Sequence, residues 1–150
     1  MRFWDSSAVL PLLSEEPYSI AVADLLRSDN DVAVWWGTWA ECAVAIGRLR
    51  REGRLDEEAE EETRAVLDLL ADGWLEVQPA DDLRLLAALV SKDHPLKTAD
   101  ALQLAAALMW CEGDTSGMSF VCLDERLRRT ALNEGFDVVP EPTEDGDEEL

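Results

Sequence analysis

Short apolar runs alternate with helical patterns along most of this 150-residue chain, and no other feature constrains its fold as strongly. Five runs have the length and apolar character of β-strands, at residues 2–4, 32–36, 74–78, 119–123 and 137–139. Apolar residues with helical spacing fill the intervals, at residues 18–27, 39–52, 56–71, 83–92, 99–110 and 125–133. Strands that alternate with helices in this way form crossover units, in which the strands run parallel. We therefore expect an α/β fold, with a mostly parallel sheet and helices on both of its faces.

The composition favours one folded domain followed by an acidic tail. Apolar residues make up 47% of the chain, and a domain of this size buries roughly 70% of the surface that its unfolded chain exposes. No linker or repeat divides residues 1–139. Residues 140–150 carry six acids and no base, together with Pro140 and Pro142, so we expect this tail to be disordered.

Charge, cysteine content and hydropathy limit the compartment and the partners. The formal net charge is −20, and without the six acids of the tail it is still −14, which disfavours binding to phosphates. The three cysteines form no CxxC pair, and their odd number favours a reduced, cytoplasmic protein over a disulfide framework. The most apolar helical stretch, residues 101–111, is too short to cross a bilayer, and the first residues do not resemble a signal peptide. We expect no membrane association.

Four acidic residues, Asp5, Glu41, Asp100 and Asp124, each lie where a strand-like apolar run meets a helical one. In an alternating α/β fold, strand-to-helix turns gather outside the carboxyl ends of parallel strands, where ligands bind. Carboxylates collected there repel one another and raise each other's pKa unless a cation joins them. Because oxygen-only ligand sets suit Mg²⁺ or Mn²⁺, the sequence predicts a metal-dependent phosphodiesterase.

Each of these acids also has an explanation at a helix start. Asp5 and Asp124 directly precede helical patterns and could cap them. Glu41 follows Thr38 by three residues, which is the spacing of a capping box. Asp100 could be a stabilising acid in a first helical turn. Singly these explanations suffice, but four such acids at four junctions favour a shared site.

Basic and aromatic residues near these acids could bind RNA. Two arginine clusters follow Glu41 and Asp124 in sequence and could grip phosphates or form surface salt bridges. Three tryptophans before Glu41 could stack on a base or pack against the core or a partner. These residues are Arg48, Arg50, Arg51 and Arg54, then Arg126, Arg128 and Arg129, and Trp35, Trp36 and Trp39.

Other catalytic arrangements are not found in the sequence. His94, the only histidine, precedes Pro95 in a predicted loop, so no Ser-His-Asp or Cys-His set is evident. His94 and the three scattered cysteines lack the spacing of a zinc site. No GxxxxGK[ST] or GxGxxG stretch occurs, which argues against these phosphate-binding loops.

Four segments together resemble the successive motifs of PIN domains, and the VapC-type ribonuclease toxins of bacterial and archaeal toxin–antitoxin pairs in particular. The segments are residues 2–8, the helix with Glu41, residues 97–107 and residues 120–127. The resemblance implies a PIN-like α/β/α sandwich with a five-stranded sheet over residues 1–139. It also implies that the four acids hold Mg²⁺ or Mn²⁺. We expect Asp5 and Asp100 to bind the metal directly, and Glu41 and Asp124 to hold it through water or to orient the attacking water.

We therefore expect a metal-dependent endoribonuclease that cleaves RNA phosphodiester bonds and acts as the toxin of a type II toxin–antitoxin pair. The resemblance implies a homodimer and a cognate antitoxin protein as partners. The alternative is a catalytically idle PIN-like module that binds RNA or protein. Four mutually repelling carboxylates argue against that alternative, because an idle domain has no physical reason to keep them together.

Overall fold

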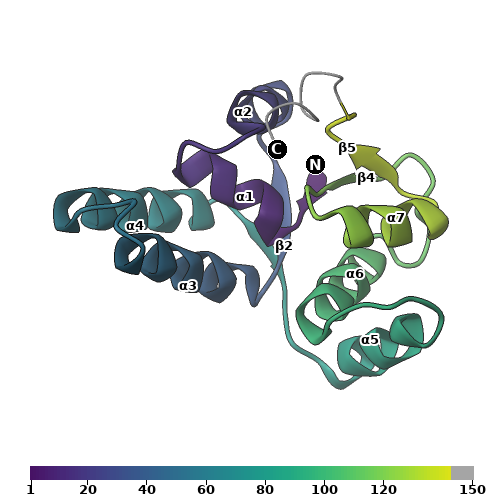
Figure 1. Ribbon diagram of the computed structural model, residues 1–150. Coiled ribbons are helices and arrows are strands. Elements are labelled where there is room, and N and C mark those ends of the chain that lie inside the picture. Colours follow the sequence, from purple (N-terminus) through teal and green to yellow (C-terminus); the bar gives the residue numbers. More distant parts are fainter. Residues whose placement is uncertain (143–150) are drawn as a thin grey trace.

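A five-stranded sheet forms the centre of this computed structural model, which describes residues 1–142 (Figure 1). All neighbouring strands pair in parallel, in the order β3-β2-β1-β4-β5. The strands are β1 (Arg2–Trp4), β2 (Val32–Trp35), β3 (Leu75–Val77), β4 (Ser119–Val121) and β5 (Asp137–Val139). The predicted parallel sheet is confirmed, and each predicted strand is present with its ends shifted by at most two residues.

The six helices predicted with bounds are also present, with ends within two residues of those expected, and the helix that Asp5 was expected to cap follows β1. The helices are α1 (Ser6–Leu13), α2 (Ser19–Ser28), α3 (Thr38–Arg51), α4 (Glu57–Ala71), α5 (Asp81–Asp93), α6 (Thr98–Trp110) and α7 (Glu125–Asn133). This helix, α1, is short and contains Pro11, which has no backbone N–H to donate to the preceding turn. Its sequence therefore lacks a long regular helical pattern.

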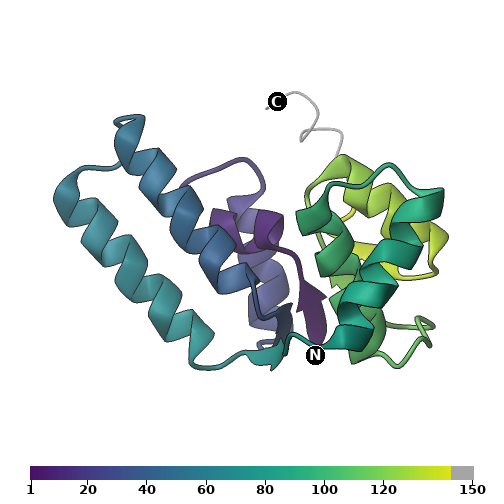
Figure 2. The ribbon, with the colours of Figure 1, turned by 90° about the horizontal axis from the view of Figure 1, so that it is seen from below.

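Two hydrophobic clusters cover the two faces of the sheet. Phe3 and Trp4 are neighbours on β1 and belong to different clusters, because successive side chains of a strand point to opposite faces. The cluster around Phe3 receives side chains from α5, α6 and α7, and the cluster around Trp4 receives them from α1, α2, α3 and α4. Figure 2 shows these two groups of helices on either side of the N-terminal strand. The expected α/β/α sandwich is confirmed.

Helices α3 and α4 form an antiparallel hairpin that projects from the sheet (Figures 1 and 2). Trp39 Nε1 donates to Asp68 near the sheet, at 3.0 Å, and Arg64 reaches across to the backbone oxygen of Ala43, at 3.2 Å. These contacts fix the direction of α3 and hence the place of its first turn, which contains Glu41.

Strand β5 ends at Val139, and the domain boundary proposed at this residue stays a prediction. Most of the predicted tail, residues 143–150, lies outside the described residues, so its disorder remains a prediction. Within residues 1–142, no helix combines the length and the apolar character needed to cross a membrane.

Candidate active site

All four predicted acids line one hollow of about 370 Å³. Asp5 directly follows β1, Glu41 lies in the first turn of α3, Asp100 in the first turn of α6, and Asp124 precedes α7. Strands β1 and β4 are parallel neighbours, so the segments that leave their carboxyl ends, with Asp5 and Asp124, enter the same region. The hollow is completed by Ser6, Ser7, Leu10, Cys42, Val44, Ala45 and Arg48.

Asp5 is the buried member of this group, with 2% of its surface exposed. Its Oδ2 accepts hydrogen bonds from the backbone N–H and the hydroxyl of Ser7. Asp5 is therefore the N-cap of α1, as predicted. The Ser7 hydroxyl in turn accepts the backbone N–H of Leu123, at 2.9 Å. The thiol of Cys122 also donates to Oδ2, at 3.6 Å. Asp5 is therefore both a helix cap and a carboxylate fixed against the end of β4.

Burial raises the pKa of Asp5 from 3.8 to about 6. The two hydrogen bonds from Ser7 oppose this rise, because they stabilise the charged form. The charges of Glu41 and Asp100 add to the rise. The ionised form of Asp5 is thus unfavourable without a cation beside it, and a bound cation would stabilise it.

Asp100 is half-buried on α6, which covers the opposite face of the sheet from α1 and α3, and its pKa is also raised. Burial is the largest cause, followed by the charges of Asp124 and Glu41, while Lys97 and Arg126 oppose them. The prediction that Asp100 lies at a strand-to-helix junction is wrong, because α6 follows helix α5 and not a strand. Asp100 reaches the hollow because α6 packs against the sheet at β2.

Glu41 is held from two other helices. Its Oε2 accepts the hydroxyl of Ser6 on α1, and its Oε1 accepts the amide of Gln103 on α6, both at 2.9 Å. The predicted capping box is wrong: Gly37 is the N-cap of α3, and Thr38 is a buried helical residue whose hydroxyl oxygen accepts the other N–H of Gln103. The side chain of Thr38 therefore faces α6 and not the free backbone N–H groups of its own helix.

Gln103 belongs to this network, although it was not among the site residues predicted from the sequence. It is completely buried among apolar residues of α6. An amide side chain inside an otherwise apolar helical run was the available signal, since buried polar groups need partners. Asp124 is exposed, and it caps α7 as its position before that helix predicted, by accepting the N–H of Leu127 at 3.0 Å.

A sequence model of the PIN domain family matches residues 2–133 of the chain. The chain belongs to the PIN domain family. PIN domains are in general nucleases and typically use a divalent metal. No curated protein matches the sequence.

Solved structures with the same fold cover nearly the whole PIN domain. A toxin–antitoxin complex from Klebsiella pneumoniae has a TM-score of 0.64 and 17% identity, over 93% of this chain and 97% of that one. The FitAB complex with a DNA fragment has a TM-score of 0.64 and 18% identity, over 93% and 94%. FitAcB from Neisseria gonorrhoeae has a TM-score of 0.63 and 18% identity, over 93% and 97%. Likeness at these identities shows a shared fold.

The acids of this PIN domain suit Mg²⁺ or Mn²⁺ in type and charge, since all four offer only oxygen ligands. Within residues 1–142, however, no three Asp, Glu, His or Cys side chains stand close enough to form a ready-made metal site. Hydrogen bonds from Ser6, Ser7 and Gln103 already use some of the acceptor positions on the carboxylates of Asp5 and Glu41. A hollow of about 370 Å³ has room for a hydrated ion, and Mg²⁺ usually keeps several waters.

The arginines of the PIN domain divide between the site and the surface. Arg48 lines the hollow, and Arg126 is near enough to Asp100 to lower its pKa. Arg54 instead pairs with Glu16 at 3.2 Å, and Arg129 pairs with Glu125 at 2.6 Å. The predicted surface salt bridges therefore occur for Arg54 and Arg129, whereas Arg48 and Arg126 lie beside the acids and their binding of phosphate stays a prediction.

The tryptophans lie outside the hollow. Trp35 is buried in the core cluster of Phe3, as the packing alternative predicted. Trp36 and Trp39 are 52% and 44% exposed, and Trp39 is tied to α4 through Asp68. None of the three is among the described residues that line the hollow, so stacking of a base there is not supported.

Proposed function

We propose that this PIN domain is a Mg²⁺- or Mn²⁺-dependent endoribonuclease and the toxin of a type II toxin–antitoxin pair. One observation carries the proposal: four carboxylates from four separate segments line a single hollow, and burial together with the neighbouring acids raises the pKa of Asp5 and of Asp100. Repulsion between ionised carboxylates destabilises the folded protein unless a cation joins them, which makes a cation at this position favourable. Nuclease activity is the general property of the family.

Asp5 and Asp100 would bind the metal directly, and Glu41 and Asp124 would bind it through water or orient the attacking water. The metal, when bound, lowers the pKa of water and stabilises charge on the phosphate oxygens. Ser7 keeps Asp5 in place and favours its ionised form. Arg48, at the wall of the hollow, would bind a phosphate and orient the chain to be cut.

Side-chain nucleophiles in the hollow are not suited to covalent catalysis. The hydroxyls of Ser6 and Ser7 both donate to carboxylates, and no histidine lies beside them. Burial raises the pKa of the Cys42 thiol to about 12, so that thiol stays protonated near pH 7 and is a poor nucleophile. These contacts favour an activated water as the attacking group.

The proposed partners are a cognate antitoxin, an RNA substrate and a second copy of the chain, all in the cytoplasm. Solved toxin–antitoxin complexes share the fold, and the net charge of −20 suits a basic antitoxin segment as a partner. Exposed apolar residues such as Trp36, Trp39, Leu85 and Leu89 offer surface that a partner or a second copy would cover.

RNA cleavage by the purified protein tests the proposal. Single-stranded RNA and DNA of the same sequence would be incubated with Mg²⁺, Mn²⁺ or EDTA. We expect cleavage of RNA with metal and none with EDTA or with Asp100→Asn. The control Glu57→Gln changes an exposed acid of α4 outside the hollow and should cleave as the wild type does.

Intact RNA under every metal condition would favour the idle binding module instead. In cells, induced expression of the wild type should arrest growth, and Asp5→Asn should abolish this effect. Equal growth arrest by both proteins would show that toxicity does not come from the carboxylate site.

A further inference from the structure

Gln103 connects the two helices that carry Glu41 and Asp100. It lies one helical turn after Asp100 on α6, and its side chain is completely buried. Its Nε2 donates one hydrogen bond to Glu41 Oε1 and one to Thr38 Oγ1, both at 2.9 Å. One amide group of α6 thus holds the first turn of α3 at two points.

The charge of Glu41 determines the orientation of this amide. Gln103 Oε1 is buried and has no hydrogen-bond partner among the described residues. A flipped amide would place Oε1 against Glu41 Oε1, and two acceptors cannot share a hydrogen bond. The observed orientation therefore serves Glu41 and leaves a buried carbonyl unsatisfied, which is unfavourable for folding. An apolar side chain of similar shape would avoid that cost, so stability alone does not account for an amide at this position.

We propose that Gln103 is a positioning residue that orients Glu41 for cleavage and fixes its distance from Asp100. This inference rests on the proposed nuclease function. Ser6 holds Oε2 of Glu41 while Gln103 holds Oε1, so both oxygens are fixed from outside α3. An ionised carboxylate has about four acceptor positions, and the two that remain would be available to a cation or to water. Because Gln103 is 0% exposed, it acts through Glu41 and not on RNA.

Gln103→Met is the informative variant, because methionine keeps the length of the side chain but removes both the N–H donors and the unsatisfied carbonyl. We expect kcat to fall roughly 10- to 100-fold, as is typical when the support of a metal ligand is lost. The KM for RNA should stay within about twofold, and the melting temperature should be unchanged or higher. Mn²⁺ binding measured by calorimetry, without RNA, should weaken about tenfold.

Leu104→Met is the matched control. It introduces the same side chain at the next, equally buried position of α6, where Leu104 faces the hydrophobic cluster away from Glu41. Exchange of leucine for methionine conserves volume and is usually tolerated. This variant should keep the wild-type kcat and Mn²⁺ affinity. Wild-type kcat and Mn²⁺ affinity in Gln103→Met as well would overturn the positioning role.

A double-mutant cycle on the metal-free protein separates this inference from the proposed function. Urea unfolding would be measured for wild type, Gln103→Met, Glu41→Ala and the double variant. Without Glu41 the buried amide loses a partner, so Gln103→Met should stabilise the Glu41→Ala background more than the wild type. Additive effects would overturn the link between the two side chains. A wild type that neither binds Mn²⁺ nor cleaves RNA would overturn the proposed function, and the positioning role with it, even if the cycle shows coupling.

Discussion

Ser7 donates both its backbone N–H and its hydroxyl proton to one oxygen of Asp5, Oδ2. The same hydroxyl oxygen accepts the N–H of Leu123, which lies just after β4. One serine therefore holds the buried carboxylate of β1 and the segment that leads to Asp124 in a fixed relation. The site depends on this bridge between neighbouring strands, and its loss has consequences that differ from those of losing a carboxylate.

Ser7→Ala should reduce RNA cleavage roughly tenfold or more, because Asp5 loses a supporting donor. Stability should fall by about 1 kcal/mol, since the N–H of Leu123 loses its partner. The Ser7 hydroxyl lowers the pKa of Asp5, so its removal raises that pKa further. The acidic limb of the pH–rate profile should then move to higher pH. Ser91→Ala, on the exposed face of α5, is the control, and an unshifted limb in Ser7→Ala would contradict the bridge.

The pKa of Asp5 also predicts how stability depends on pH in the absence of metal. Its folded-state pKa of about 6 lies above the ordinary value of 3.8, so the folded protein binds this proton more tightly than the unfolded chain does. The contribution of Asp5 is therefore most favourable below pH 3.8 and is lost as the pH rises through about 6. Between these two pH values the free energy of unfolding should fall by at most about 3 kcal/mol.

Urea unfolding of wild type and Asp5→Asn from pH 4 to pH 7 measures this contribution. The wild type should lose more stability than Asp5→Asn as the pH rises, because the amide does not titrate. Asp137→Asn, which changes an exposed acid of β5, should follow the wild type. Parallel curves for wild type and Asp5→Asn would show that the buried carboxyl titrates normally.

Metal should reverse this penalty at neutral pH. A ligand that binds only the folded state adds about 2.7 kcal/mol at a 100-fold excess over its Kd. The melting temperature at pH 7 should therefore rise with Mn²⁺ in the wild type and stay constant in Asp5→Asn/Asp100→Asn. Each protein is compared with and without metal, because the amides relieve repulsion in the empty site as well. An equal rise in the double variant would exclude the metal from the four carboxylates.

Local patterns in the sequence were sufficient to predict the sheet, six of the helices and the hollow's four acids. Alternation of apolar residues identifies strands and helices within a few residues, and parallel order places their connecting segments at one edge. The start of α1 was predicted from its cap Asp5, but its end was not, since Pro11 interrupts the helical pattern. The place of Asp100 followed from packing of α6 on the sheet and not from a strand that precedes it.

The contacts that support Glu41 could not be predicted, because they join residues far apart in the chain, whereas the support of Asp5 by Ser7 is local. Ser6 reaches Glu41 across 35 positions, and Gln103 reaches it across 62. Thr38 had the spacing of a capping box with Glu41, but tertiary packing turned it toward Gln103. Helix-start rules describe one helix alone, whereas these side chains are shared between helices. Such partners emerge only when the positions of α1 and α6 relative to α3 are known.

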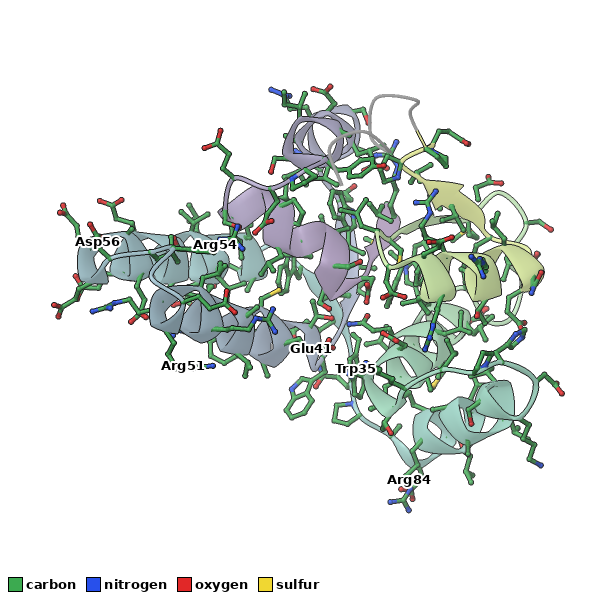
Figure 3. The ribbon with its side chains drawn as sticks, viewed as in Figure 1. Trp35, Glu41, Arg51, Arg54, Asp56 and Arg84 are labelled. Atoms are coloured by element: carbon green, nitrogen blue, oxygen red, sulfur yellow. The ribbon has the colours of Figure 1, made fainter. Side chains whose placement is uncertain are left out.

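Arg48 provides the test of how RNA enters the hollow. Among the described residues that line the hollow, Arg48 is the basic one. It lies on α3, about two helical turns beyond Glu41. Figure 3 shows Glu41 at the inner end of that helix and Arg51 farther out. Arg48→Gln should raise the KM for RNA about tenfold at low salt and leave kcat nearly unchanged, because it removes a phosphate contact and no carboxylate. The slope of log affinity against log salt should shrink by about 1. Arg50→Gln, exposed on the same helix but outside the hollow, should change both quantities less. Equal effects of the two substitutions would mean that RNA is held by the overall charge of α3 and not by a phosphate site beside the four acids.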